Sequence, residues 1–174
     1  METTELKPLQ QAFREAMARV CVPVAVVTAV SAVGRPHGTT VSAFSSLSLD
    51  PPMVLVCLDR RSDLLALLHP GRPFGVNVLL RSQSEVARRF ARKGHAKFAG
   101  TPWTCPAGVP RLTGAGAFLA CRTERLVDGG DHVIVLGTVT TANAVAAAPL
   151  TYHDRGFGTH LPLGGQPQIG QSGR

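Results

Sequence analysis

Short apolar runs, each closed by a turn signal of Gly, Pro, Asn, Asp or Ser, set the strongest limit on what this chain can fold into. Runs of this length that are rich in Val, Leu and Ala are typical of strands. The predicted strands cover residues 22–33, 38–43, 53–58, 74–80, 116–127 and 132–142, with a last short one ending near Tyr152. Asp128-Gly129-Gly130-Asp131 separates two of these runs and predicts a β-hairpin. We therefore expect a mainly β fold, a β-barrel with added helices.

Three segments predict the helices. Apolar residues recur at helical spacing over residues 8–20, and a leucine-rich run at 64–68 follows two residues that commonly cap helices. Ser82-Gln83-Ser84-Glu85 matches a capping box, which predicts a basic helix over residues 83–93. The serine-dense residues 42–50 are expected to be irregular, because Pro51-Pro52 excludes a helix there.

Composition indicates a single well-filled domain, since hydrophobic residues make up 44% of the 174 positions. We expect this domain to span residues 1–158 and a flexible or partner-bound tail to follow over 159–174, because the chain from Gly156 onward is rich in Gly, Pro and Gln. The four cysteines lack zinc-type spacing, and three lie in apolar runs where a reduced, buried thiol is expected. The longest apolar stretch is too short for a membrane span and the N-terminus lacks a signal-peptide layout, so we expect a cytoplasmic protein.

The net charge of +7 comes mostly from one segment. Residues 81–97 contain one acidic side chain, Glu85, and six basic ones: Arg81, Arg88, Arg89, Arg92, Lys93 and Lys97. A basic stripe can bind nucleic acid, but only 5% of the residues are aromatic and no nucleic-acid-binding motif is present, so we expect no such partner. The other interpretations are a solvated helix face and the steering of a small polyanion, such as a phosphorylated cofactor, toward a site.

The densest polar cluster within an apolar frame runs from Thr39 to Pro52. Its hydroxyls and backbone amides suit a phosphate or the O2, N3 and O4 edge of a flavin ring, although a serine-rich loop can also cap its own backbone. His132 stands at a strand start, where it can bind charge or shuttle a proton near neutrality, or simply face water. The other histidines show no ligand spacing, so no metal is expected. Tyr152 either stacks on a planar ligand or closes the core.

Taken in order, several segments resemble the flavin reductase-like family, whose fold is the FMN-binding split barrel. The resemblance covers about residues 10–158. It rests on Phe13-Arg14, Pro23 to Thr28, Gly38 to Pro52, Phe74 to Leu79, Lys97 to Gly100, Gly130-Asp131-His132 and Pro149-Leu150. The resemblance implies a Greek-key-like split barrel that forms a homodimer and binds flavin in a groove at the subunit interface.

The same resemblance implies roles for individual residues. The ring edge and ribityl chain of the flavin would meet Thr40, Val41, Ser42, Ala43, Ser46, Leu47 and Ser48. The ribityl phosphate would lie along Cys57, Leu58, Arg61 and Ser62, with Lys97 and Phe98 near the flavin. His132 would position the nicotinamide nucleotide, together with Tyr152 and Arg155 from a closing segment in which Asp154 interrupts the family's usual run.

The activity implied by the family is that of an NAD(P)H:flavin oxidoreductase. Such a protein holds a nicotinamide against FAD or FMN at about 3 to 3.5 Å, passes a hydride to flavin N5 and releases the reduced flavin to a partner monooxygenase. Amides of the serine-dense segment would favour the negative charge that reduction places near flavin N1 and O2. NADH is the simpler assumption and NADPH the alternative. The competing hypothesis is a flavin- or haem-binding split-barrel protein that stores or senses its ligand without reducing it.

Overall fold

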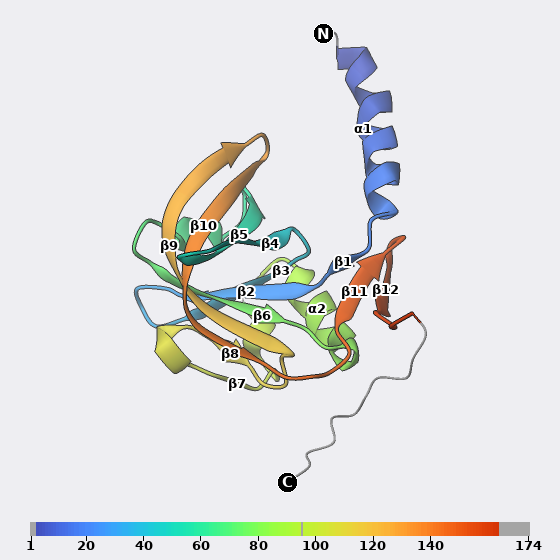
Figure 1. Ribbon diagram of the computed structural model, residues 1–174. Helices are drawn as coiled ribbons and strands as arrows, with labels where there is room; N and C mark the ends of the chain where they lie inside the picture. Colours follow the sequence, from blue (N-terminus) through green and yellow to red (C-terminus); the bar gives the residue numbers. More distant parts are fainter. Residues whose placement is uncertain (1–2, 95, 164–174) are drawn as a thin grey trace.

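The computed structural model describes residues 3–94 and 96–163 and is built around one curved antiparallel sheet (Figure 1). Its seven strands run in the order β3-β2-β6-β9-β10-β5-β4. Their bounds are Ala25–Val30 (β2), Pro36–Val41 (β3), Phe44–Leu49 (β4), Pro52–Asp59 (β5), Pro73–Val78 (β6), Ala117–Gly129 (β9) and His132–Ala144 (β10). The sheet curls so that β3 contacts β5, and the neighbours β2–β6 and β10–β5 are far apart in sequence. The prediction of a mainly β, Greek-key-like barrel is confirmed.

Smaller strands complete the β structure. Val22–Pro23 (β1), Leu150–His153 (β11) and Gly156–Thr159 (β12) form a separate three-stranded sheet in the order β1-β11-β12. Trp103–Thr104 (β7) pairs with Arg111–Leu112 (β8). The run at residues 22–33 is thus two strands instead of one. Residues 156–159 pair with β11, so the Gly-rich segment from Gly156 begins as a strand and Thr159, the first residue of the expected tail, is paired. Residues 164–174 of that tail lie outside the described residues.

The predicted β-hairpin is confirmed, whereas the serine-dense segment is not irregular. β9 and β10 pair along almost their whole length across the Gly129–Gly130 turn, where Gly130 adopts φ +67°. Phe44–Leu49 forms the edge strand β4, which pairs with β5 and carries a register shift between Ser46 and Ser48. An edge strand tolerates serines among its apolar residues because part of the strand is exposed, and the partner strand β5 supplies its backbone hydrogen bonds.

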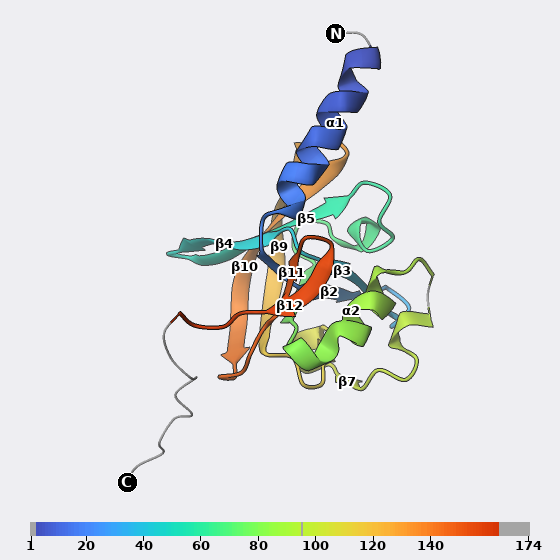
Figure 2. The ribbon, with the colours of Figure 1, turned by 90° about the vertical axis from the view of Figure 1, so that its right-hand side faces the viewer.

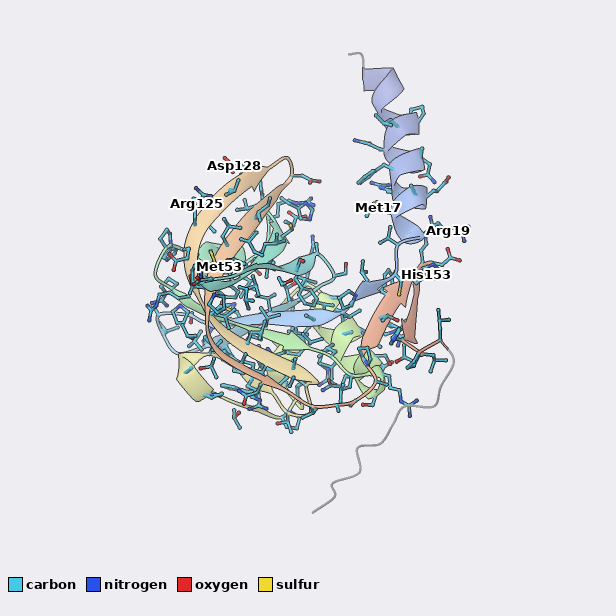
Figure 3. All side chains as sticks on the ribbon, viewed as in Figure 1. Met17, Arg19, Met53, Arg125, Asp128 and His153 are labelled. Carbon is cyan, nitrogen blue, oxygen red and sulfur yellow. The ribbon has the colours of Figure 1, made fainter. Side chains whose placement is uncertain are left out.

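Helix α1 (Thr3–Ala18) begins five residues before the predicted start at Pro8 and ends two before the predicted Val20. Inside a helix a proline loses its amide hydrogen bond and its ring crowds the carbonyl four residues earlier, but Pro8 is close enough to the start of α1 for the helix to continue through it. Both views show α1 projecting away from the sheet (Figure 1 and Figure 2). Its lower end is held by the turn between β11 and β12, where the Asp154 amide donates to Ala18 O at 2.7 Å and Arg19 contacts the Asp154 carboxylate at 3.4 Å. Figure 3 labels Arg19 and His153 at this junction.

The basic helix is present as α2 (Ser84–Ala91), preceded by a 3-10 turn at Arg81–Gln83. Figure 2 shows α2 lying against β3. Ala87 and Phe90 are fully buried in a core with Leu79 and Leu150, which explains why the arginines of this helix face outward. The predicted capping box is wrong: the Gln83 side-chain oxygen accepts the Leu80 amide at 3.0 Å, and no serine side chain caps the helix.

Two further local predictions need correction. The leucine-rich run at 64–68 forms only a 3-10 turn at Leu65–Leu67, without a side-chain cap, because Leu64 and Leu68 are buried on a segment too short for an α-helix. All four cysteines are free, but only Cys121 is buried, and burial raises the pKa of its thiol to about 12. Cys57 is half-buried, and Cys21 is exposed because it lies in the connection between α1 and β1.

No helix among residues 3–94 and 96–163 is long and apolar enough to cross a membrane.

Candidate functional site

Two adjoining cavities lie where β3, β5 and the C-terminal end of α2 meet. The smaller, which we call the hydroxyl pocket, has a volume of about 240 Å³. Its lining is Thr39, Thr40, Val41, Ser42, Ala43, Cys57, Leu58, Asp59, Ser62 and His132. The larger, the basic pocket, has a volume of about 460 Å³. Its lining is Pro36, His37, Gly38, Thr39, Asp59, Arg61, Ser62, Asp63, Leu64, Ala91, Arg92, Lys93, Gly94, Lys97 and Phe98. Thr39, Asp59 and Ser62 line both cavities, so the two lie side by side, and we call the pair the groove.

The hydroxyl pocket is made by the ends of three strands. β3 ends at Val41, β5 ends at Asp59 and β10 begins at His132, which lies directly opposite Asp59 in the register of the sheet. The Ala43 carbonyl accepts the Cys57 amide at 2.8 Å, which holds the chain after β3 against β5. The pocket therefore combines hydroxyl groups with the apolar surface of Val41, Ala43 and Leu58, an environment that suits a planar ring with a polar edge.

A charged cluster marks the boundary between the two pockets. Arg61 donates to both carboxylate oxygens of Asp59, at 3.1 and 2.8 Å, and its amide donates to the same carboxylate at 2.8 Å. These hydrogen bonds lower the pKa of Asp59 and raise that of Arg61. His132 Nδ1 lies 2.7 Å from the Asp131 carboxylate, and that contact lowers the pKa of Asp131. With Nδ1 engaged by Asp131, Nε2 is the ring nitrogen left for a ligand.

Lys97 fixes the far wall of the basic pocket. Its ammonium donates to Gly38 O at 3.1 Å and to Phe90 O at 3.2 Å, so it joins a 3-10 turn (Ala96–Phe98) to β3 and to α2. Burial lowers the pKa of Lys97. The approach is close: a Cβ at Gly38 would lie 2.8 Å from the Phe90 ring, so glycine is needed at this point of β3.

The basic segment is largely engaged by the protein itself. Arg88 pairs with Glu85 at 2.7 Å and lies over the Phe157 ring, and Arg89 donates to Ala99 O and to Thr101. Arg92, Lys93 and Lys97 line the basic pocket. Of the three interpretations of this segment, this arrangement favours the steering of a small polyanion over a uniform basic face for nucleic acid.

The groove brings together most of the residues that the sequence nominated. Thr40, Val41, Ser42, Ala43, Cys57, Leu58, Ser62 and His132 line the hydroxyl pocket, and Arg61, Ser62, Lys97 and Phe98 line the basic pocket. Thr40 also has a packing role, since its hydroxyl donates to Ala87 O at 2.7 Å.

Five nominated residues lie outside both pockets. Ser46, Leu47 and Ser48 are on the edge strand β4, where Leu47 is 46% exposed. Tyr152 and Arg155 belong to the β11–β12 hairpin, which lies beside α1 and far from the tip of the β9–β10 hairpin labelled at Asp128 (Figure 3). A single chain therefore does not bring these side chains to the groove, and their roles stay predictions.

Sequence reasoning missed several lining residues. His37 on β3 and Asp59 at the end of β5 carried no motif of their own. Thr39 was visible only as the first residue of the polar cluster, Asp63 only as a capping residue and Leu64 only as the start of the leucine-rich run. Arg92 and Lys93 were visible only as part of a charge excess. Within the described residues, no group of three or more His, Cys, Asp or Glu side chains is placed to hold a metal ion.

Three curated relatives place the chain among known proteins. It is 41% identical over 150 residues to the actinorhodin polyketide dimerase of Streptomyces coelicolor, covering 85% of each chain. It is 40% identical over 157 residues to the NADH:riboflavin 5'-phosphate oxidoreductase of Streptomyces pristinaespiralis, covering 87% of this chain and 89% of that one. It is also 37% identical to the reductase component of the 4-nitrophenol 4-monooxygenase/4-nitrocatechol 2-monooxygenase of Rhodococcus opacus, covering 93% and 88%.

Structural comparison and a family model agree with these matches. An NADH:FAD oxidoreductase of Streptomyces globisporus, solved in complex with NAD and FAD fragments, superposes with a TM-score of 0.82 at 32% identity and covers 90% of this chain and 95% of that chain. The model of the flavin reductase like domain matches residues 17–160. Sheet, groove and matches agree, and the chain belongs to the flavin reductase-like family of split-barrel proteins.

Proposed function

We propose that this protein is an NADH-dependent flavin reductase that supplies diffusible reduced flavin to a partner monooxygenase. The observation that carries the proposal is the groove, in which a pocket lined by hydroxyl groups and apolar side chains adjoins a basic pocket. Flavin nucleotides have the same division, since a planar ring with a polar edge is joined through a ribityl chain to phosphate. Relatives named as NADH:flavin oxidoreductases and as a monooxygenase reductase component support both halves of the proposal.

The chain's own residues suit the ring and its tail. Val41, Ala43 and Leu58 offer apolar surface to the ring, while the Ser42 and Ser62 hydroxyls can donate to its polar edge. Arg61, held in place by Asp59, lies where the groove turns basic and suits the ribityl phosphate. His132, which is paired with Asp59 at the start of β10, would bind the nicotinamide nucleotide through Nε2.

The overall reaction is NADH + H⁺ + flavin → NAD⁺ + reduced flavin, in which a hydride leaves nicotinamide C4 and reaches flavin N5. The cofactors supply the redox chemistry, and the protein orients the two rings and excludes water. Because the groove is open and the flavin must leave for an oxygenase, we treat the flavin as a substrate. The nicotinamide is regenerated inside the cell, which places the proposed reaction in the cytoplasm.

Spectrophotometry tests the proposal directly. Purified protein with NADH and either FMN or FAD is expected to consume NADH steadily. The consumption is measured as the decrease of the near-ultraviolet absorbance of NADH. Bound flavin without turnover would instead establish the storage or sensor hypothesis. Unquenched flavin fluorescence on titration with the protein would rule out the reductase and the flavin-binding form of the storage or sensor hypothesis.

We also propose that the working unit is a homodimer, with residues 1–158 as the folded domain of each copy. The apolar side chains of α1 recur at helical spacing but remain exposed in the single chain: Leu9, Phe13 and Met17, at 48% to 64%, with Val20 just after the helix also exposed at 44%. An amphipathic helix with an uncovered apolar row is typical of an interface. A second copy is the occupant we favour, because Tyr152 and Arg155 lie beside the base of α1 and only another subunit could bring them to a groove.

Phe13→Glu is therefore expected to convert the dimer to a monomer, because it places a charge in the centre of the apolar row of α1. Sedimentation equilibrium measures the mass of wild type and variant. Gln11→Lys adds a charge to the opposite face of the same helix, next to Glu15, and is expected to remain dimeric. A wild-type protein that sediments as a monomer, or a dimeric Phe13→Glu variant, would contradict this assignment of the interface.

A further inference from the structure

One arginine holds the turn of the β9–β10 hairpin against the end of β5. Arg60 follows β5 directly, and its guanidinium donates to Gly130 O at 2.8 Å through Nε and to the Asp128 carboxylate at 2.6 Å through Nη2. Its backbone amide donates to Asp131 O at 3.1 Å. These three contacts, which we call the Arg60 clamp, reach three of the four turn residues 128–131, at the hairpin tip where Figure 3 labels Asp128.

The Arg60 clamp determines where the turn lies rather than how stable the protein is. The side chains of Arg60 and Asp128 are 45% and 83% exposed, and an exposed ion pair contributes little to the free energy of unfolding. The hairpin itself is held by the pairing of β9 with β10, in which Gly129 lies opposite His132. β10 in turn pairs with β5 as far as His132 and Asp59, so beyond that pair Arg60 provides the hydrogen bonds between the turn and the end of β5.

The turn fixed in this way carries the carboxylate that orients His132. His132 Nδ1 lies 2.7 Å from the Asp131 carboxylate, and this contact lowers the pKa of Asp131, so the carboxylate is ionised near neutrality. An ionised carboxylate only accepts hydrogen bonds, so Nδ1 carries the proton of the neutral ring. The Asp131 side chain is 94% exposed in the single chain. Packing therefore does not locate it, and its place follows from the backbone of the turn, which Arg60 holds at Gly130 O and Asp131 O.

We propose that Arg60 is a positioning residue for nicotinamide binding: it fixes the hairpin turn, the turn places Asp131, and Asp131 holds the His132 ring with Nε2 toward the ligand. The inference rests on the proposed function, because it deepens the role of His132 as the contact for the nicotinamide nucleotide. Arg60 itself lines neither pocket, unlike the adjacent Arg61, which lines the basic pocket. Loss of Arg60 should therefore affect the nicotinamide through His132 and leave the flavin surface of β3 and β5 in place.

A double-mutant cycle tests whether Arg60 acts through His132. Arg60→Ala is expected to raise the KM for NADH about fivefold, with the KM for flavin within about twofold of wild type. Arg60→Ala/His132→Ala is expected to have the same KM for NADH as His132→Ala alone, about tenfold above wild type, because the ring through which Arg60 acts is already gone. Independent contributions would multiply to about fiftyfold, and that result would overturn the inference.

Two further variants and a control complete the kinetic test. Asp128→Ala removes the carboxylate contact and should raise the KM for NADH by about twofold, since Gly130 and Asp131 still accept from Arg60. Arg60→Lys keeps the charge near Asp128 but lacks the fork that also reaches Gly130 O, so it should recover part of the affinity lost in Arg60→Ala. Arg125→Ala is the matched control: it removes an exposed arginine of the same hairpin that lines neither pocket, and both KM values should stay unchanged (Figure 3).

Nitrogen NMR of the His132 ring, with its signals assigned by comparison with His132→Ala, tests the same inference without turnover. At mildly alkaline pH, wild type and Arg125→Ala are expected to carry the ring proton on Nδ1, whereas Arg60→Ala is expected to show a mixture of the Nδ1-H and Nε2-H forms. A ring that stays in the Nδ1-H form in Arg60→Ala would overturn the inference, as would an unchanged KM for NADH. Wild-type protein that does not oxidise NADH would instead reject the proposed function, and the NMR comparison would still decide whether Arg60 orients His132.

Discussion

Asn77→Ala is expected to lower the free energy of unfolding by about 3 kcal/mol, because Asn77 satisfies several buried backbone groups at once. The side chain is fully buried on β6. Its oxygen accepts the Leu112 amide at 2.8 Å, and its nitrogen donates to Val26 O at 3.2 Å and to Pro110 O at 3.3 Å. Alanine leaves the buried Leu112 amide without its acceptor and removes one of the donors to Pro110 O, which the Thr28 hydroxyl still contacts at 2.6 Å. For a chain of this size the loss corresponds to a Tm lower by roughly 6–12 °C.

Thermal and denaturant unfolding of wild type and variant measure this effect. Asn143→Ala, on the exposed end of β10, is the matched control and is expected to stay within about 0.5 kcal/mol of wild type. Asn77 ties β8 and the loop before it to the barrel, and β8 pairs with β7, which follows the 3-10 turn that holds Lys97 and Phe98. Weaker flavin binding should therefore accompany the loss of stability. An unfolding free energy within about 1 kcal/mol of wild type would show that other contacts hold this loop.

His132→Ala is expected to raise the KM for NADH about tenfold, because the variant loses one hydrogen bond to a charged or strongly polar group of the ligand. The KM for flavin is expected to change less than about twofold. The reason is position: His132 is the first residue of β10 and reaches the rim of the hydroxyl pocket, whereas the ring surface comes from β3, β5 and the segment after each. Asp131 fixes the imidazole through Nδ1.

Steady-state kinetics with each substrate varied in turn separates the two KM values. His132→Asn keeps a side-chain donor and should recover part of the affinity for NADH, which a purely structural residue would not show. His153→Ala, on the β11–β12 hairpin, is the control and should leave both values unchanged (Figure 3). Equal losses of affinity for NADH and flavin in His132→Ala would reject a role specific to the nicotinamide.

Patterns among neighbouring residues predicted the elements whose buried and exposed faces are set within the element itself. The β9–β10 hairpin is visible because two apolar runs flank Asp128-Gly129-Gly130-Asp131, a turn in which Gly130 takes a positive φ. The amphipathic face of α2 is visible because Ala87 and Phe90 alternate with arginines at helical spacing. The serine-dense segment was misjudged for the converse reason, since β4 exists only through its pairing with β5.

In the candidate site, too, residues within recognisable segments were predicted and isolated residues were not. The ordered family segments identified Thr40 to Ala43, Arg61, Ser62, Lys97 and His132 as one set, and eight of the nominated residues do line the hydroxyl pocket. Asp59 was missed because a single aspartate at a strand end has no sequence signature, although its contact with Arg61 sets the boundary of the two pockets.

The sequence alone determined the strand-rich class of the fold, the central hairpin, the basic segment and the family, because each is written in neighbouring residues or in an ordered series of motifs. Only the tertiary structure decided which charges are free. Arg88, Arg89 and Lys97 find their partners in Glu85, in the 99–101 loop and in β3, while Arg92 and Lys93 are left facing the groove. The spacing of side chains shows which face of a helix is polar and accounts for the Arg88–Glu85 pair within α2. The partners of Arg89 and Lys97 lie in other segments and depend on how the chain packs.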